Sequence, residues 1–317
     1  MKYGLLGEVV INIFPEWLYQ KLAKDYLLDY VYEVRVRLNK PIAICYKGNY
    51  ENITIKNGYA SQNIIATQNL IDYIFTSATK HSLYAYNNEI KEGFITTDGG
   101  IRIGLCGEVV YNKNEVATIK NITSMNIRIA HQVYDCSKKI IDLISQNGNV
   151  KNTLVISPPG AGKTTIIRDI VYKLSYEKGI DNILVVDERF EIAGYGKDVF
   201  DLGSGVDVIS GSTKNFAFSR CLKTMNPKVV VTDEIVSKAD IEEIMQMARA
   251  GVKIIASAHA ENINDLKNKK ELNVLLEDKV FERIVVLSKS HYIGKVEVVV
   301  DGNLKPIYLP GLLWRYC

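Results

Sequence analysis

The chain is poor in the features that define several common protein classes. Its 317 residues include five cysteines, an odd number, and no Cys-x-x-Cys pair. We therefore expect a reducing compartment, with neither a disulfide framework nor a structural zinc site. No apolar run reaches the roughly 18 residues of a transmembrane helix, and the first residues lack the small-residue cleavage site of a signal peptide. A peripheral role at a membrane stays open.

Net charge is nearly absent as well. The formal charge is +3; the first 150 residues hold 16 basic and 14 acidic side chains, and the remainder 23 and 22. Domains that bind nucleic acid usually carry a strong basic patch, so we expect no stable nucleic-acid partner. Hydrophobic residues make up 47% of the chain, which is enough for packed cores. At about 100–200 residues per domain, the length suggests two domains.

The first half combines helical and strand patterns. In residues 31–38, apolar side chains alternate with Glu33, Arg35 and Arg37, which is typical of a half-buried strand. Asp98-Gly99-Gly100 tolerates positive φ and predicts a hairpin turn. The pattern predicts helices over residues 16–30, 67–80 and 137–146 and strands over residues 31–38 and 42–46. We interpret this half as a smaller mixed α+β domain.

The second half has a different pattern of apolar residues. Apolar β-branched runs recur at residues 153–156, 183–186, 229–231, 252–256 and 284–287, with helical stretches between several of them. Runs without alternation are typical of strands buried on both faces of a parallel sheet, and their alternation with helices indicates an α/β fold. The expected division is residues 1–135 for the N-terminal domain, 136–150 for a linker helix region, and 151–317 for an α/β domain that ends in a β-hairpin.

A glycine-rich loop follows the first of these apolar runs and opens a helix. Backbone N–H groups in such a loop bind phosphate oxygens. The pattern predicts that Lys163 reaches the β- and γ-phosphates of ATP and that the hydroxyl of Thr164 ligates Mg²⁺. Serine stands at position 157, where the pattern has glycine. The expected nucleotide-binding residues are Ser157, Pro158, Pro159, Gly160, Ala161, Gly162, Lys163, Thr164 and Thr165. We expect Arg168, one turn into the helix, to be structural.

Three more apolar runs end in residues that suit nucleotide hydrolysis. Asp233 and Glu234 end one run; a carboxylate pair beside a phosphate loop is typical of enzymes that hold Mg²⁺ and orient a water molecule. Glu188 and Arg189 follow a second run, and His259 ends a third. The carboxyl ends of parallel strands meet at one edge of the sheet. We therefore expect a single site there, with Asp233 on Mg²⁺ and the other four residues in catalysis.

Taken together, the motifs resemble those of the stage III sporulation protein AA family, which is related to the secretion and pilus ATPases of type II and type IV systems. The resemblance covers residues 30 to 290. In the second half it is carried by Ser157–Thr165, Asp187–Gly194, Asn226–Ile235 and Ala256–Ala260. In the first half it is carried by Glu33–Pro41, Gly93–Gly107 and Ser124–Ala130.

The resemblance implies a RecA-like P-loop ATPase domain and a homo-hexameric ring that uses ATP and Mg²⁺. It implies a cytoplasmic protein of the mother cell, held peripherally at the membrane around the forespore by the membrane proteins of a sporulation channel complex. The N-terminal domain would then serve ring formation or docking.

A ring makes the scarce arginines informative, because a neighbouring subunit can supply an arginine finger. Of the ten arginines we rank Arg189 and Arg220 first; Arg102 and Arg128 also match positions in the family's segments. Residues 203–211, rich in glycine and serine, are expected to form a mobile loop.

Two other functions remain open at this stage. One is a nucleic-acid translocase or helicase; the near-neutral halves and the lack of a basic, aromatic-rich tract count against it. The other is a nucleotide-switch scaffold without significant turnover, although Lys163, Asp233 and Glu234 are all present. A small-molecule kinase is disfavoured because arginine is scarce after Thr164.

Overall fold

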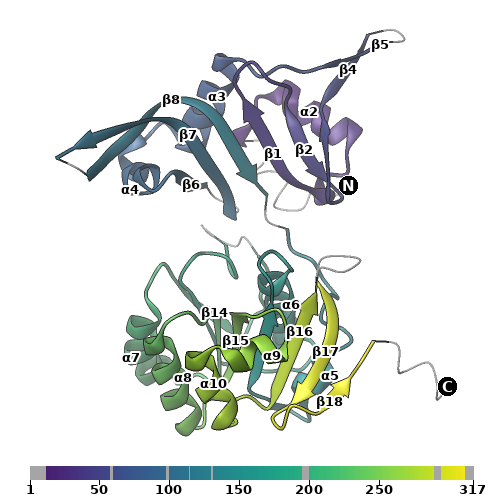
Figure 1. Ribbon diagram of the computed structural model, residues 1–317, viewed down its shortest axis with the longest axis vertical. Coiled ribbons are helices and arrows are strands. Elements are labelled where there is room, and N and C mark those ends of the chain that lie inside the picture. The colour runs from purple at the N-terminus through teal and green to yellow at the C-terminus, as the bar shows by residue number, and fades with distance from the viewer. Residues whose placement is uncertain are drawn as a thin grey trace. The chain divides into compact units, whose positions relative to one another are not determined.

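The computed structural model describes residues 12–57, 60–97, 100–113, 115–129, 131–194, 200–288 and 294–310. They divide into two compact units. The N-terminal unit contains the described residues up to His131, and the C-terminal unit contains those from Gln132 onward, apart from Gly194. Figure 1 draws the N-terminal unit in purple to blue and the C-terminal unit in teal to yellow.

The N-terminal unit is built on an antiparallel sheet of six strands in the order β3-β2-β1-β8-β7-β6. Its strands are β1 (Val31–Arg37), β2 (Ala43–Tyr46), β3 (Asn49–Asn52), β6 (Phe94–Thr97), β7 (Ile101–Asn112) and β8 (Glu115–Arg128), with a separate pair β4 (Thr54–Asn57) and β5 (Ala60–Asn63). Its helices are α2 (Glu16–Asp25), α3 (Gln68–Ala78) and α4 (Asn87–Lys91), with 3₁₀ turns η1 (Leu28–Tyr30) and η2 (Leu83–Tyr86).

Alternation along the strands separates the two faces of this sheet. Val34 and Val36 of β1 are fully buried in one core with Leu22 of α2 and Ile71 of α3. The intervening side chains stand on the opposite face. The predicted strands and the helix over 67–80 are present, whereas the first helix ends at Asp25, short of residue 30. The turn expected at Asp98-Gly99 lies outside the described residues.

The C-terminal unit contains an eight-stranded sheet in the order β13-β12-β14-β15-β11-β16-β17-β18, with the first six strands parallel. Its strands are β11 (Thr153–Ser157), β12 (Ile183–Asp187), β13 (Val206–Ser210), β14 (Val229–Glu234), β15 (Lys253–His259), β16 (Arg283–Ser288), β17 (Lys295–Asp301) and β18 (Pro306–Tyr308), plus a short pair β9 (Ser145–Gln146) and β10 (Asn149–Val150). Its helices are α5 (Ile141–Ile144), α6 (Lys163–Tyr176), α7 (Lys214–Met225), α8 (Lys238–Arg249), α9 (Ile263–Asn268) and α10 (Lys270–Glu277).

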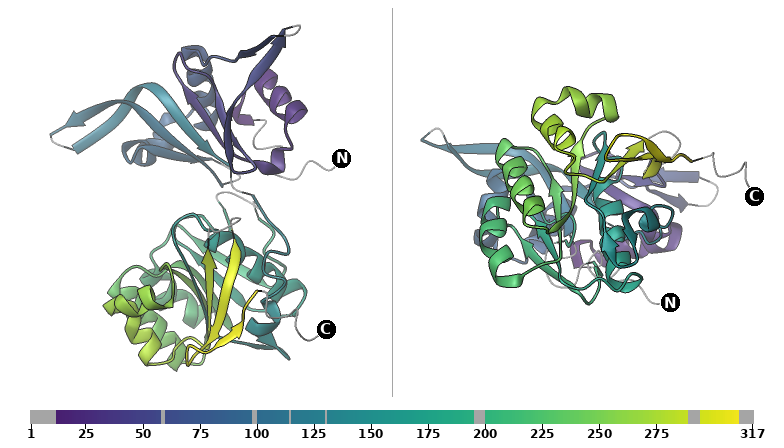
Figure 2. Two further views of the ribbon diagram at one scale, coloured as in Figure 1. Left: turned by 45° about the vertical axis from the view of Figure 1, so that its right-hand side comes forward. Right: turned by 90° about the horizontal axis from the view of Figure 1, so that it is seen from below.

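Helices cover both faces of this sheet, which explains its unbroken apolar strands. Leu154 of β11 points into a core shared with α7, α8 and α10, whereas its neighbour Val155 points into a core shared with α6. Figure 1 and Figure 2 show α7, α8 and α10 on one side of the sheet and α6 on the other. The antiparallel strands β17 and β18 form the predicted closing hairpin.

Two sequence expectations were wrong. Only Ile141–Ile144 of the helix expected over 137–146 is α-helical. Asn147 and Gly148, both at positive φ, form a hairpin turn that draws residues 145–146 into β9.

The segment 203–211, expected to be a mobile loop, contains the edge strand β13, paired in parallel with β12. Its glycines serve close packing rather than mobility. A Cβ at Gly203 would lie 2.3 Å from Cβ of Ser175, and a Cβ at Gly205 would lie 3.1 Å from Cα of Asp181.

Asp169 of α6 fixes the segment that enters the C-terminal unit. Its buried carboxylate accepts hydrogen bonds from the backbone N–H of Asp135 at 3.0 Å and of Ser137 at 2.7 Å, and from the Ser137 hydroxyl at 2.6 Å. Asp169→Ala would leave these donors without their acceptor. We expect it to lower the free energy of unfolding by about 2–4 kcal/mol in urea titrations at neutral pH.

Asp142→Ala is the matched control, because Asp142 forms an exposed ion pair with Lys178. It should change the unfolding free energy by less than about 0.5 kcal/mol. Equal urea midpoints for the two variants would contradict the structural role of Asp169.

Candidate functional site

The glycine-rich loop connects β11 to α6. In the sheet, β11 lies between the strands β15 and β16. Gly160 has φ 69° and Gly162 has φ 92°, a left-handed conformation that other residues adopt only with strain. Ser157, as the last residue of β11, needs no such conformation, and its hydroxyl donates to the carbonyl of Pro158 at 2.7 Å. The departure from glycine at position 157 is therefore accommodated. Pro159 and Ala161 complete the loop, and Thr164 and Thr165 follow Lys163 in α6.

Four neighbouring parallel strands end at this same edge of the sheet. In the order β12-β14-β15-β11 they end in Asp187, Glu234, His259 and Ser157. The structure thereby brings most of the predicted site residues together. Their side chains make two sets of contacts, one around His259 and one around Lys214.

The first set links Lys163 to Glu234 through His259. Nζ of Lys163 lies 2.8 Å from Nδ1 of His259, and Nε2 of His259 lies 2.8 Å from Oε1 of Glu234. An ammonium only donates, so Nδ1 accepts and the proton of the neutral imidazole is on Nε2, which donates to the carboxylate. Arg189, half-exposed, adds an ion pair of 3.7 Å from Nη1 to Oε2 of Glu234.

The second set centres on Lys214, which the sequence analysis missed. Its buried ammonium lies 2.8 Å from Oδ1 of Asp233 and 2.9 Å from Oε2 of Glu188. Burial would lower the pKa of Lys214, but the pairing with Asp233 and Glu188 prevails and raises it. Burial also raises the pKa of Asp233, and the nearby Lys214 opposes that effect.

No specific sequence signal identifies Lys214. It is the first residue of α7, after the N-cap Thr213, whose side chain accepts from the N–H of Phe216. A cation at this position opposes the helix dipole. Lysine also opens α6, α8 and α10, so the position alone does not mark a site residue.

The loop that carries Glu188 and Arg189 is held in place by hydrogen bonds between its backbone and the side chains of Asp187 and Arg168. The buried carboxylate of Asp187 accepts three backbone hydrogen bonds of 2.8–3.0 Å, from residues 191, 192 and 193. The guanidinium of Arg168 donates to the carbonyls of residues 191 and 192 at 2.6 and 2.8 Å and lies 3.5 Å from the ring centroid of Phe200. Burial lowers the pKa of Arg168 to about 10. Arg168 therefore remains charged at neutral pH, in the structural role expected for it.

The donor set fits Mg²⁺ bound together with a phosphate. Asp233 is 6% exposed, and neither of its carboxylate oxygens accepts a well-aligned hydrogen bond from the described residues. The hydroxyl of Thr164 lies 3.4 Å from Oε2 of Glu191. No group of three or more His, Cys, Asp or Glu side chains among the described residues is arranged to hold a metal alone. Mg²⁺ typically uses one or two carboxylates and completes its shell with water and substrate phosphates.

Of the remaining arginine candidates, Arg220 belongs to the C-terminal unit and the others to the N-terminal unit. Arg220 is exposed on α7, and within residues 200–288 it makes no ion pair with the cluster. In the N-terminal unit, Arg102 of β7, Arg128 of β8 and Glu33 of β1 are in register across three strands, and Arg35 pairs with Glu33. With Arg37, these arginines gather on the sheet face opposite the core.

Two other histidines lie in the N-terminal unit. Nε2 of His131 lies 2.8 Å from the carbonyl oxygen of Val31, and His81 is exposed with φ 58°. His291 lies outside the described residues.

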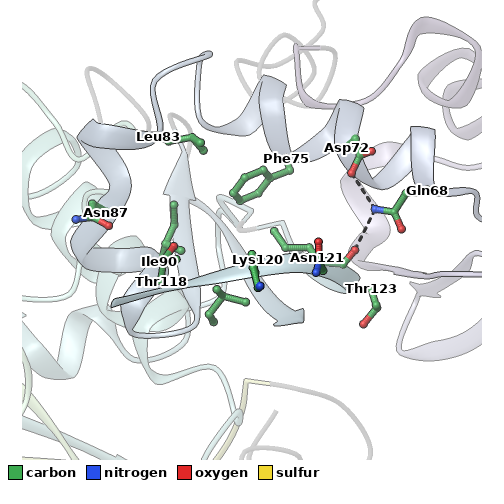
Figure 3. Close-up of a pocket in the computed structure, with 12 residues that line it drawn as sticks. Gln68, Asp72, Phe75, Leu83, Asn87, Ile90, Thr118, Lys120, Asn121 and Thr123 are labelled. Carbon is green, nitrogen blue, oxygen red and sulfur yellow. Dashed lines mark hydrogen bonds between the residues drawn. The ribbon is translucent and has the colours of Figure 1, made fainter. Parts of the chain in front are cut away.

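A separate groove of about 710 Å³ lies in the N-terminal unit, between α3, α4 and β8. Figure 3 shows Phe75, Leu83 and Ile90 beside it, and Gln68 bonded to Asp72 at 2.8 Å. Its cation Lys120 pairs with Glu108 at 3.1 Å. Its lining residues in the described part of the chain include Asp72 and Lys120 but no histidine or cysteine.

Two comparisons of the sequence with known proteins point to one family. The family model for "Sporulation stage III, protein AA" matches residues 9–305. Stage III sporulation protein AA of Bacillus subtilis (strain 168) is 33% identical over 281 residues, which cover 86% of this chain and 88% of that protein.

Two solved structures share the fold. The ATPase DotB of Legionella pneumophila matches with a TM-score of 0.56 and 13% identity, over 87% of this chain and 77% of that one. The pilus retraction motor PilT with bound ADP matches with a TM-score of 0.53 and 13% identity, over 84% of this chain and 76% of that one.

At 13% identity this likeness concerns the fold alone. It confirms the predicted fold class, an α/β domain with a mainly parallel sheet in the fold of these P-loop ATPases, after a smaller mixed α+β domain. None of the helices within the described ranges has the length and apolar character needed to cross a membrane. The family model extends over nearly the whole sequence. The chain belongs to the stage III sporulation protein AA family.

Proposed function

We propose that this protein is a Mg²⁺-dependent ATPase that powers or assembles a secretion-like channel complex between mother cell and forespore. The observation that carries the proposal is the convergence of Lys163, Asp233 and Glu234 at one edge of a parallel sheet, where His259 links Lys163 to Glu234. The fold shared with an ATPase and with a pilus motor that binds ADP supports the nucleotide. Membership of a sporulation family supports a role during endospore formation.

In this proposal the loop Ser157–Thr165 binds the phosphates of ATP through its N–H groups, and Lys163 turns from His259 to the β- and γ-phosphates. Thr164 and Asp233 would hold Mg²⁺, which neutralises phosphate charge when bound. The transferred γ-phosphoryl group needs a water molecule in line with the bond that breaks.

Glu234 is the better placed of the two carboxylates to orient that water. It adjoins Asp233 and is held by His259 on one oxygen and Arg189 on the other. Glu188 instead forms an ion pair with Lys214. We therefore assign water positioning to Glu234 and a supporting role to Glu188.

The two leading arginines suit different roles. Arg189 already lies beside Glu234 of its own chain, so it fits a role within one subunit. Arg220 is exposed on α7, so it is free to reach a neighbouring subunit. We propose that the active form is a homo-hexameric ring in which Arg220 is the finger supplied in trans.

The proposed roles of the chain segments follow the expected domain boundaries. We propose that residues 1–135 serve ring formation or docking, that residues 136–150 link the domains, and that residues 151–317 hydrolyse ATP. The ring would lie in the mother-cell cytoplasm and contact the membrane around the forespore through the membrane proteins of the channel complex.

The assignment of Glu234 predicts unequal effects of two matched amide substitutions. Glu234→Gln should lower kcat by about 10²–10⁴-fold, because the carboxylate that orients and polarises water is lost. Glu188→Gln should lower it much less. Steady-state phosphate release, with ATP binding measured separately, checks both. Turnover of Glu234→Gln at the wild-type rate would remove Glu234 from this role.

The ring predicts a nucleotide-dependent mass. Light scattering with and without ATP and Mg²⁺ should show a hexamer that forms or is strengthened with nucleotide. Lys163→Ala, which removes the phosphate contact, should abolish both turnover and this change in mass. A wild-type protein that stays monomeric with saturating ATP and Mg²⁺ would exclude a trans role for Arg220. If it binds nucleotide without turnover, it would be a switch scaffold instead.

A further inference from the structure

Lys214 is placed as a cation between two carboxylates. Its Nζ lies within 2.9 Å of both Asp233 and Glu188, which end or follow the neighbouring strands β14 and β12. Both Lys214 and Asp233 are buried, at 4% and 6% exposure. The ammonium thus stands where a divalent cation shared by these carboxylates would be attracted.

The alignment of this contact distinguishes it from a structural bridge. The oxygens of Asp233 accept no well-aligned hydrogen bond from the described residues, although Nζ lies 2.8 Å from Oδ1. The ammonium therefore supplies charge without satisfying the lone pairs of Asp233. The acceptor capacity that Asp233 retains suits a metal ion, which prefers carboxylate oxygens as ligands.

The position of Lys214 in the chain adds a cost to this arrangement. It opens α7, where the helix dipole disfavours a cation. It also follows the Gly211-Ser212 turn from the edge strand β13, and Gly211 has φ 69°. Exposed lysines also open α8 and α10, so what points to a role for Lys214 at the site is its burial between the two carboxylates.

We propose that Lys214 neutralises Asp233 and Glu188 before nucleotide binds and so makes metal binding depend on nucleotide. The inference rests on the proposed function, in which Asp233 is the Mg²⁺ ligand. A divalent ion alone must displace a buried ammonium. An ion that arrives with ATP brings phosphate oxygens as additional ligands and a negative charge to which Lys214 can turn. Lys214 is a positioning residue, since it acts through Asp233 and Glu188.

The test is a titration of the full chain with Mn²⁺ in the absence of nucleotide. Electron paramagnetic resonance measures how much Mn²⁺ is bound. Lys214→Met should bind Mn²⁺ at least about tenfold more tightly than the wild type, because the competing charge is removed from the carboxylates. Lys214→Arg, which keeps the charge, should remain like the wild type. Lys228→Met is the matched control: it removes a lysine of the same unit that pairs with Asp181 on the surface. It should leave Mn²⁺ binding unchanged.

A purely structural Lys214 predicts a different result. Lys214→Met would then be less stable and would bind Mn²⁺ no more tightly than the wild type, which would overturn the proposal. The double variant Lys214→Met with Asp233→Asn removes both charges, so it should fold and fail to bind Mn²⁺. Tight Mn²⁺ binding by the double variant would also overturn the proposal, because the metal would lie elsewhere.

Failure of the proposed function is recognised separately. A fluorescent ATP analogue with Mg²⁺ reports nucleotide binding by the wild type. If it does not bind, the ATPase proposal fails, whereas the Mn²⁺ titration still decides the role of Lys214.

Discussion

The central physical constraint on this protein is the repulsion among carboxylates at one sheet edge. Parallel strands all end on the same side, so β12 and β14 deliver Asp187, Glu188, Asp233 and Glu234 to one small region. Like charges at this separation destabilise the fold unless cations or hydrogen bonds offset them. Much of the local architecture serves that end: three N–H groups bind Asp187, and Lys214 pairs with Asp233 and Glu188.

The same contacts connect the fold to its chemistry. Lys163 donates to His259, which donates to Glu234, so the lysine proposed to bind phosphate and the carboxylate proposed to position water share one histidine. In the proposed function, ATP with Mg²⁺ would offer new partners: phosphate oxygens for Lys163 and a divalent cation for Asp233. Without ligand, the site residues are paired with one another. Binding would then exchange these internal contacts for contacts with nucleotide.

The sequence was most informative where a local pattern has one physical solution. The run of apolar residues before Gly160 and Gly162 predicted a buried strand followed by a glycine-rich loop, and both are present. It was least informative where a long-range contact decides. Lys214 is 19 residues from Asp233 in the chain, and only the parallel pairing of β12 with β14 brings Glu188 to the same ammonium. The glycines at 203 and 205 suggested mobility, but they meet α6 and the loop after it in close packing.

The most direct test is a crystal structure of the full chain with Mg²⁺ and a non-hydrolysable ATP analogue. The account predicts phosphate oxygens at Lys163, with its contact to His259 broken, and Mg²⁺ between Thr164 and Asp233, with Lys214 withdrawn from Asp233. It would be contradicted by a nucleotide bound away from the loop at Ser157–Thr165. It would equally be contradicted by a bound nucleotide that leaves the Lys163–His259 and Lys214–Asp233 contacts in place.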